Sequence, residues 1–177
     1  MNMVIFWIDY LIVFSLAILA WSLIIFGFIG PPAVATPRKI ILQALAEISL
    51  TKDAFLIDLG SGDGRVLAIA QKQYGAFGLG YEINPLLVLW SRFRALLLGV
   101  KNIKFKNKNY LKQDWSKADA IYMYLLPKYI PAVVKKIENE GKKGVMVVSQ
   151  RFAIETWGNK LIKEIPRKSN STFIYKF

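Results

Sequence analysis

One strand–loop–helix unit constrains the fold of this chain more than any other feature. A short apolar run at residues 55–59 leads into a glycine-rich loop at residues 60–64, and a helical pattern follows at residues 66–74. Glycine allows positive φ angles and close approach of a ligand to the backbone, so the loop predicts a binding site. Asp58 and Asp63 would repel a pyrophosphate there, whereas they would not repel a ligand with an ammonium and a sulfonium group.

Strand and helix patterns alternate along the rest of the chain. Further strands are predicted at residues 77–83, 103–105, 120–124 and 144–149, and further helices at residues 85–98 and 129–139. This alternation predicts a parallel sheet with helices on both faces. Two shorter strand candidates, residues 161–165 and 171–176, can pair antiparallel across the turn at residues 166–170. Thr36 and Pro37 are expected as the N-cap and the first residue of one more helix.

Polar side chains follow the first three predicted strands, where a parallel sheet binds its ligands. Glu82 closes the second strand, and an acid at that position accepts the two hydroxyl groups of a ribose. Asn109, with Tyr110, follows the third strand, where its amide oxygen can accept from an adenine amino group. An NAD-type Rossmann fold is the alternative. It is disfavoured because the loop departs from G-x-G-x-x-G and because Asp63 opposes phosphate.

The amino-terminal segment is almost wholly apolar. Residues 4–29 contain one charge, Asp9, and a membrane-spanning helix needs roughly 20 apolar residues. A cleavable signal peptide is the competing interpretation, since Ala33-Val34-Ala35 resembles a cleavage site. The absence of a preceding basic residue and the length of the run favour a retained anchor. All 24 basic residues follow the run, so the positive-inside rule predicts a single-pass protein whose domain is cytoplasmic.

Three regions are therefore expected: an anchor at residues 1–30, a linker at residues 31–37, and a domain at residues 38–177. From residue 31 onward, 24 basic and 11 acidic residues give 24 − 11 = +13. This charge has two interpretations. It either attracts anionic lipids or an acidic partner, or it is simply a solvated, lysine-rich surface. The lysines within residues 101–112 carry no nucleic-acid motif, so nucleic acid is not expected as a partner.

The absence of two residue types limits the chemistry. The chain contains no cysteine and no histidine. Without cysteine, disulfides and thiolate nucleophiles are excluded. Without histidine, the chain lacks the commonest metal ligand and the commonest general base. We expect no metal site.

Two motifs resemble those of class I S-adenosylmethionine-dependent methyltransferases. Residues 58–64 read Asp-Leu-Gly-Ser-Gly-Asp-Gly, like their first motif, and residues 80–85 read Gly-Tyr-Glu-Ile-Asn-Pro, like their second. Residues 82–88 and 91–95 are similar to a family of small protein-lysine methyltransferases with membrane-anchored mitochondrial and soluble archaeal members. The resemblance implies a Rossmann-like sheet with helices on both faces, preceded here by one transmembrane helix.

Further matches and departures surround these motifs. Ala35-Thr36 in the linker and Arg151-Phe152 after the fifth strand also match the family, and the resemblance extends roughly over residues 31–160. The family commonly has Asp where Asn109 stands and Pro where Val34 stands. The adenine contact and the shape of the linker are the two features that these departures affect.

The resemblance implies S-adenosylmethionine as the cofactor and assigns residues to it. The residues expected to bind it are Thr36, Asp58, Gly60, Ser61, Gly62, Asp63, Gly64, Glu82, Ile83 and Asn109. Asp58 would hold the loop or the cofactor's ammonium group, and Asp63 would position the same end through water. Glu82 would bind the ribose, while Ile83 and Asn109 would contact the adenine. For Thr36, a plain helix cap is an equal alternative.

The methyl acceptor is expected to lie at the end of the fourth strand. Related enzymes direct this region towards the methyl group, which here points to Tyr124, Leu125 and Pro127 as pocket residues; no catalytic residue is assigned. Strand alternation would bury one of Tyr122 and Tyr124 as core. An apolar pocket would lower the pKa of a target lysine, and alignment of the neutral amine would supply much of the acceleration.

Three functional classes stay open. The first is a protein-lysine methyltransferase acting on a membrane or membrane-proximal protein, the class that the resemblance favours. The second is a methyltransferase for a lipid or quinone-like small molecule. The third is a non-catalytic module that only binds the cofactor. The oligomeric state is not predicted.

Overall fold

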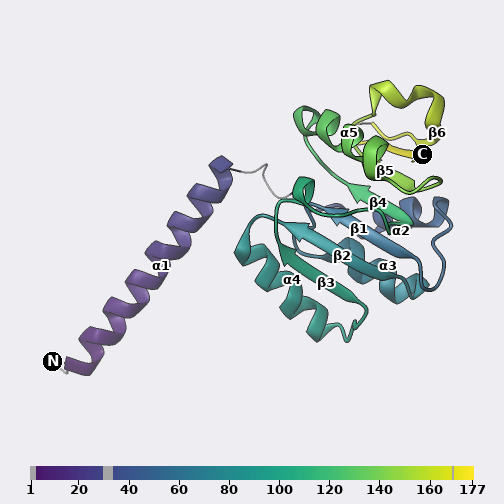
Figure 1. Ribbon diagram of the computed structural model, residues 1–177. Helices are drawn as coiled ribbons and strands as arrows, with labels where there is room; N and C mark the ends of the chain where they lie inside the picture. The colour runs from purple at the N-terminus through teal and green to yellow at the C-terminus, as the bar shows by residue number, and fades with distance from the viewer. Residues whose placement is uncertain (1–2, 30–33, 169) are drawn as a thin grey trace. The chain divides into compact units, whose positions relative to one another are not determined.

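The computed structural model describes residues 3–29, 34–168 and 170–177, and the chain divides near residue 32 into two compact units (Figure 1). The first unit is the single helix α1 (Met3–Ile29), 27 residues long. Among the described residues, no helix is both long enough and apolar enough to span a membrane. The predicted anchor is thus not confirmed, and the predicted linker lies partly outside the described residues.

The second unit is a seven-stranded sheet with helices on both faces (Figure 1). Its strands are β1 (Phe55–Leu59), β2 (Phe77–Glu82), β3 (Ile103–Asn107), β4 (Ala120–Met123), β5 (Met146–Gln150), β6 (Leu161–Ile165) and β7 (Thr172–Lys176). Its helices are α2 (Arg38–Glu47), α3 (Arg65–Tyr74), α4 (Pro85–Leu97) and α5 (Ile130–Glu140), with short 3-10 turns η1 (Tyr110–Lys112), η2 (Pro127–Tyr129) and η3 (Glu155–Lys160).

The strand order is β3-β2-β1-β4-β5-β7-β6. Strands β1 to β5 are parallel, which confirms the predicted parallel sheet. Strand order reverses between β1 and β4, and ligands of such sheets bind in the crevice at that point. Asp58 lies at this crevice, since it pairs in register with Gly80 of β2 and with Tyr122 of β4.

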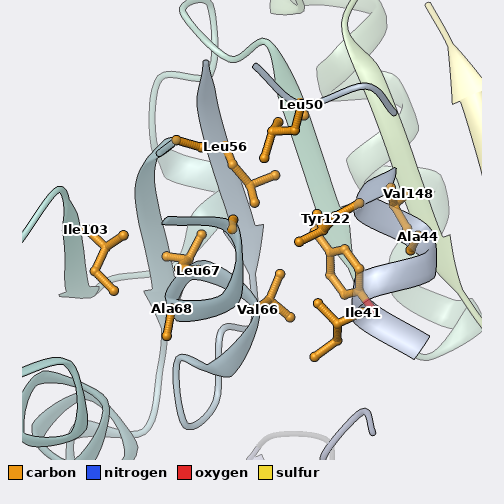
Figure 2. Packing of buried hydrophobic residues seen from close by; sticks show 14 of the residues in the cluster. Ile41, Ala44, Leu50, Leu56, Val66, Leu67, Ala68, Ile103, Tyr122 and Val148 are labelled. Carbon is orange, nitrogen blue, oxygen red and sulfur yellow. The ribbon is translucent and has the colours of Figure 1, made fainter. Parts of the chain in front are cut away.

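Two apolar clusters hold helices to the two sheet faces. Successive strand residues point to opposite faces, so Leu56 packs with α2, α3 and α4 while Ile57 packs with α5. Figure 2 shows the first cluster, in which Ile41 of α2 and Val66 of α3 lie close to the Tyr122 ring. These contacts fix both ends of the glycine-rich loop, because the strand before it and the helix after it are both buried.

Strands β6 and β7 form the predicted antiparallel pair, but β7 also inserts beside β5, which the sequence did not predict. Burial explains the order. Thr172, Ile174 and Tyr175 of β7 are buried, whereas the residues of β6 are exposed or half-buried, as suits an edge strand. Strand β3 runs to Asn107, two residues beyond the predicted end.

The expected cap of α2 is wrong by one residue. Helix α2 begins at Arg38, and its N-cap is Pro37, which makes no side-chain capping bond. Thr36 is buried, and its backbone carbonyl accepts a bond from the Arg65 Nη1 at 3.2 Å. Thr36 is therefore tied to the helix that follows the glycine-rich loop and does not cap its own.

Candidate active site

The glycine-rich loop has the backbone conformation that its sequence predicts. Gly60, Gly62 and Gly64 have φ angles of +75°, +51° and +74°. The N–H groups of Gly60 and Ser61 donate to the Tyr81 carbonyl at 2.9 and 3.0 Å, which binds the loop to the end of β2. Left-handed φ angles favour glycine, so this close turn depends on having glycine at these three positions.

Glu82 joins the loop to the beginning of α4. One carboxylate oxygen accepts from the Gly62 N–H at 3.0 Å, and the other accepts from the Asn84 N–H at 2.9 Å. A carboxylate oxygen has two acceptor sites, so each oxygen keeps capacity for one more donor. Glu82 therefore stands where the ribose hydroxyls are expected while also bracing the loop; the ribose contact itself stays a prediction.

Asp58 is a buried acid with an unsatisfied oxygen. Its exposed fraction is 3%, and Oδ2 has no hydrogen-bond partner among the described residues. Burial, followed by the charges of Glu82 and Asp63, raises its pKa to about 8. Without a ligand the buried acid therefore holds its proton at neutral pH, and a cationic group of a ligand would stabilise the deprotonated carboxylate in its place. Of its two predicted roles, the geometry favours contact with the ammonium group.

Two more buried hydroxyls near Asp58 lack a partner in the part of the chain that the structure describes, those of Ser61 and Tyr122. Burial and the charge of Asp58 raise the pKa of Tyr122. Unpaired buried polar groups are rare in folded proteins. Their gathering at the sheet's switch point indicates a polar ligand that completes them.

Asp63 lies in an arginine cluster that the sequence did not predict. Its carboxylate accepts hydrogen bonds from Arg65 Nε and Nη2 at 2.9 and 2.7 Å, and from Arg94 Nη1 at 2.5 Å. Burial would raise the pKa of Asp63, but the bonds and charges of Arg65 and Arg94 outweigh burial and lower it. Asp63 thus fixes the loop to α3 and α4, and its predicted contact through water stays a prediction.

The predicted adenine side is held by asparagines. Ile83 is 46% exposed, and Asn107 Nδ2 donates to its carbonyl at 2.7 Å and to the Glu82 carbonyl at 3.0 Å. Asn109 Oδ1 accepts from the Leu111 N–H at 2.9 Å and caps η1. The oxygen assigned to the adenine amino group thus already has one backbone donor. Asn107 was missed, although its place at the end of β3 was a usable signal.

The predicted acceptor pocket is partly assembled. Tyr122 is the tyrosine that strand alternation buries, while Tyr124 is half-buried at the end of β4. Leu125 is buried, and its Cδ2 lies 3.6 Å from where a Cβ at Gly60 would stand. Arg151 has a left-handed φ of +75°, and its Nη1 lies 3.4 Å from the Tyr124 hydroxyl oxygen. Pro127, by contrast, is exposed at the start of η2.

These residues fit S-adenosylmethionine chemically. Asp58 offers a buried carboxylate to a cation, Glu82 offers acceptors for hydroxyls, and the loop backbone allows close approach. The acidic groups of Asp58 and Glu82 disfavour the phosphates of a dinucleotide at this site. Within the described ranges, no group of three acidic side chains is arranged to hold a metal ion.

Comparisons with known proteins agree with this chemistry. The family model described as the ANTKMT methyltransferase domain matches residues 58–160. A lysine N-methyltransferase of Xenopus laevis that is named for a subunit of ATP synthase is 33% identical over 127 residues, which cover 71% of this chain and 54% of the relative. The chain thus spans about half the length of that relative. A protein-lysine N-methyltransferase of Saccharolobus islandicus is 28% identical, covering 82% of this chain and 92% of the relative.

A solved structure is similar over most of the same region. It is an RNA methyltransferase from Salinibacter ruber in complex with S-adenosyl-L-homocysteine, with a TM-score of 0.77 and 28% identity. The match covers 81% of this chain and 93% of that one. The predicted resemblance and the Rossmann-like class I methyltransferase fold are confirmed.

Proposed function

Because the chain belongs to the ANTKMT methyltransferase domain family, we propose that it transfers methyl groups from S-adenosylmethionine to lysine side chains of a protein in or near a membrane. The observation that carries this proposal is the buried Asp58 carboxylate, which has an oxygen without a partner in the described structure. An acid kept in this state at the switch point suits a cationic nucleoside. The curated relatives are named as lysine methyltransferases, which supports the choice of acceptor.

The chain's own residues divide the work of binding. Asp58 would face the ammonium group, and Glu82 would accept the ribose hydroxyls without releasing the Gly62 N–H. Ile83 would pack on the adenine, and Asn109 would contact its edge. The cofactor supplies a methyl group activated by a positively charged sulfur. Thr36, Gly60, Ser61, Asp63 and Gly64 complete the proposed binding set through the loop and the segment before α2.

Methylation of a lysine requires its amine to be neutral and aligned. The chain contains no histidine to remove the proton. The apolar wall that the buried Leu125 provides would disfavour the charged amine and lower its pKa. Tyr124, whose hydroxyl lies beside Arg151 Nη1, would then help to position it. Without an assisting base, most of the acceleration of methyl transfer would come from holding the amine nitrogen in line with the methyl group.

The membrane anchor is the second element of the proposal. Helix α1 has 27 residues and one charge, Asp9, and at 1.5 Å per residue it is about 40 Å long. A bilayer core is roughly 30 Å thick. The basic domain would lie on the cytoplasmic side, because basic residues are retained there. Sequence supports this placement, and a protease-protection assay on the full chain tests it.

The acceptor is tested by incubating the full chain with radiolabelled methyl donor, membranes and RNA. We expect label in protein bands and, after acid hydrolysis, in methyl-lysine. Label in the solvent extract would instead indicate a lipid or quinone-like acceptor, and label in RNA would indicate the acceptor class of the Salinibacter protein. Binding of the donor with no labelled fraction would leave only a cofactor-binding module. A Glu82→Ala variant controls for contaminating activity.

A further inference from the structure

Arg151, the residue that follows β5, has a backbone conformation that arginine rarely adopts. Its φ of +75° lies in the left-handed region, which strains a residue with a long side chain. The Arg151 N–H donates to the Ser171 carbonyl at 2.7 Å, and this bond holds the backbone in place. Strain of this kind persists only where neighbouring contacts impose it, and residues that carry it cluster at functional sites.

A buried polar network fixes the residue before Arg151. The Gln150 side chain is fully buried, and its Nε2 donates to Asn170 Oδ1 at 3.0 Å. The hydroxyl of Thr172, also fully buried, donates to Gln150 Oε1 at 2.8 Å. This network joins β5 to β7, so the end of β5 is held from two sides. The direction in which the Arg151 side chain leaves the backbone is therefore set by the fold.

That direction places the guanidinium at the proposed acceptor pocket. Met123 of β4 pairs in register with Ser149 of β5, so the residues that follow these two strands emerge at the same edge of the sheet. Arg151 Nη1 lies 3.4 Å from the Tyr124 hydroxyl oxygen. Leu59 of β1 also pairs with Met123, so the glycine-rich loop begins next to Tyr124. Arg151 thus stands beside the pocket into which the amine is proposed to enter.

No acid neutralises the charge of Arg151 within the described residues, since none of their ion pairs includes it. The arginines of the loop differ, because Arg65 and Arg94 both pair with Asp63. An acid would suit the place of Arg151 better if the pocket only had to bind a lysine as its ammonium form, because opposite charges attract. The unpaired guanidinium therefore points to a role in the step that precedes methyl transfer.

We infer, on the basis of the proposed function, that the positive charge of Arg151 favours the neutral form of the acceptor amine over its ammonium form. A like charge within about 4–6 Å disfavours a second charge, and an amine that touches the Tyr124 hydroxyl would lie at about that distance. The amine's proton leaves to water. The nitrogen lone pair then forms the bond to the methyl carbon, while the carbon–sulfur bond breaks and its electron pair stays on the sulfur. In a chain without histidine, Arg151 would promote by its charge the deprotonation that a base would otherwise perform.

Other charged groups near this end of β4 act in fixed directions. The charges of Asp58 and Arg167 both affect Tyr122, which lies two residues before the pocket tyrosine on the same side of β4, and burial raises the pKa of Tyr122 and keeps it neutral. Asp58 would favour the ammonium form, but it is proposed to face the cofactor's own ammonium group. Asp63 is bound by two arginines, and Glu82 is bound by two backbone N–H groups. These groups and the cofactor's sulfonium stay the same when position 151 is changed, so variants at that position isolate its charge.

The test compares variants of the full chain by the pH dependence of kcat, which reports groups in the bound complex. Arg151→Lys keeps the charge, Arg151→Gln removes it and keeps the backbone strain, and Arg151→Gly removes both. Formation of radiolabelled methyl-lysine is followed from about pH 6 to 10, with donor and membranes in excess. We expect the midpoint of the rise in rate to move up by about one pH unit in the Gln and Gly variants, which makes them roughly tenfold slower at neutral pH. Arg151→Lys should keep the parent's midpoint, as should Lys135→Gln, which removes an exposed charge from α5.

The alkaline end of the profile separates charge from structure. Above the midpoint, the Gln and Gly variants should be at least as fast as the parent, because the charge of Arg151 also opposes the positive charge that develops on the nitrogen during transfer. Arg151→Gly relieves the strained φ, so it should unfold at a similar or higher temperature than the parent. Rates that fall equally at every pH, or a midpoint that moves in Arg151→Gln but not in Arg151→Gly, would overturn the inference and leave the proposed function intact. Absence of methyl-lysine from the parent at every pH would overturn both.

Discussion

The Gly62 N–H donates to the Glu82 carboxylate at 3.0 Å, which joins the glycine-rich loop to the acid at the end of the neighbouring strand. Two features that are separate in the sequence thus act as one structural unit. Any change at Glu82 is expected to alter both the loop and the proposed ribose contact.

Glu82→Ala should weaken donor binding. The variant loses the proposed bonds to the ribose and also the brace on the loop, and hydrogen bonds to charged groups are worth about 1.5–3 kcal/mol each. We expect a loss on the order of 2–3 kcal/mol in a calorimetric titration with S-adenosylmethionine. Glu140→Ala, on the exposed end of α5, is the matched control and should bind normally. Unchanged affinity in Glu82→Ala would remove its assigned role.

Much of the fold follows from local sequence. The β1–loop–α3 unit and Glu82 stand where they were predicted, because glycines, strand ends and apolar periodicity act over a few residues. The contacts of Asp63 with Arg94 and of Thr36 with Arg65 were not predicted. They join residues 31 and 29 positions apart, and only the packed fold brings them together. The insertion of β7 beside β5 depends in the same way on which strand has the more buried side chains.

Asn109→Asp tests the departure at the adenine side. Asn109 Oδ1 already accepts from the Leu111 N–H, and an aspartate can keep that cap while offering a second, charged acceptor. We expect donor affinity in a titration to be retained or increased. A large loss would show that the amide nitrogen of Asn109 makes the important contact.

Arg94→Ala should loosen the loop. Asp63 would keep Arg65 but lose the shorter contact to Arg94. Because both side chains are partly exposed, the cost should be modest, about 1 kcal/mol in the free energy of unfolding. Chemical denaturation measures it. Arg92→Ala is the comparison, since Arg92 holds the Phe105 carbonyl instead, and it should leave the loop's cofactor affinity unchanged. Because a looser loop binds the cofactor less well, Arg94→Ala should lower that affinity, and an equal loss in Arg92→Ala would contradict a specific role for Arg94.

Gly64→Ala should destabilise the domain strongly. Gly64 has a φ of +74°, and an added Cβ would lie 2.5 Å from the Phe105 ring and 2.9 Å from Ser91. We expect a loss of about 2–4 kcal/mol, combining backbone strain and overpacking. Gly99→Ala has a similar φ of +66° with open space around it, so it should cost only about 1–2 kcal/mol. Thermal unfolding of the two variants separates the clash from the backbone term. Similar losses of stability in both variants would show that the clash with Phe105 and Ser91 adds nothing to the backbone strain.

Asp58→Asn should make the protein more stable at alkaline pH but a weaker binder of the donor. The folded pKa of Asp58 is about 8, above its ordinary 3.8, so the folded state holds the proton more tightly than the unfolded chain. The stability that this proton contributes is complete below pH 3.8 and is lost as pH rises through about 8. Asparagine has no such loss, and the unfolding midpoint of the variant should exceed that of the parent more at pH 8 than at pH 5.

The expected difference in midpoint between those two pH values is about 10 °C, since a fully buried acid shifts stability by a few kcal/mol and each kcal/mol moves the midpoint by a few degrees. Asp119→Asn is the matched control with the opposite sign. Bonds from Lys142 and from the Phe55 N–H lower the pKa of Asp119, so its removal should cost stability at pH 8. Weaker donor binding in Asp58→Asn, together with its added stability, would mark Asp58 as an acid retained for its ligand. If Asp58→Asn lost stability at pH 8 as Asp119→Asn does, Asp58 would instead be a structural residue.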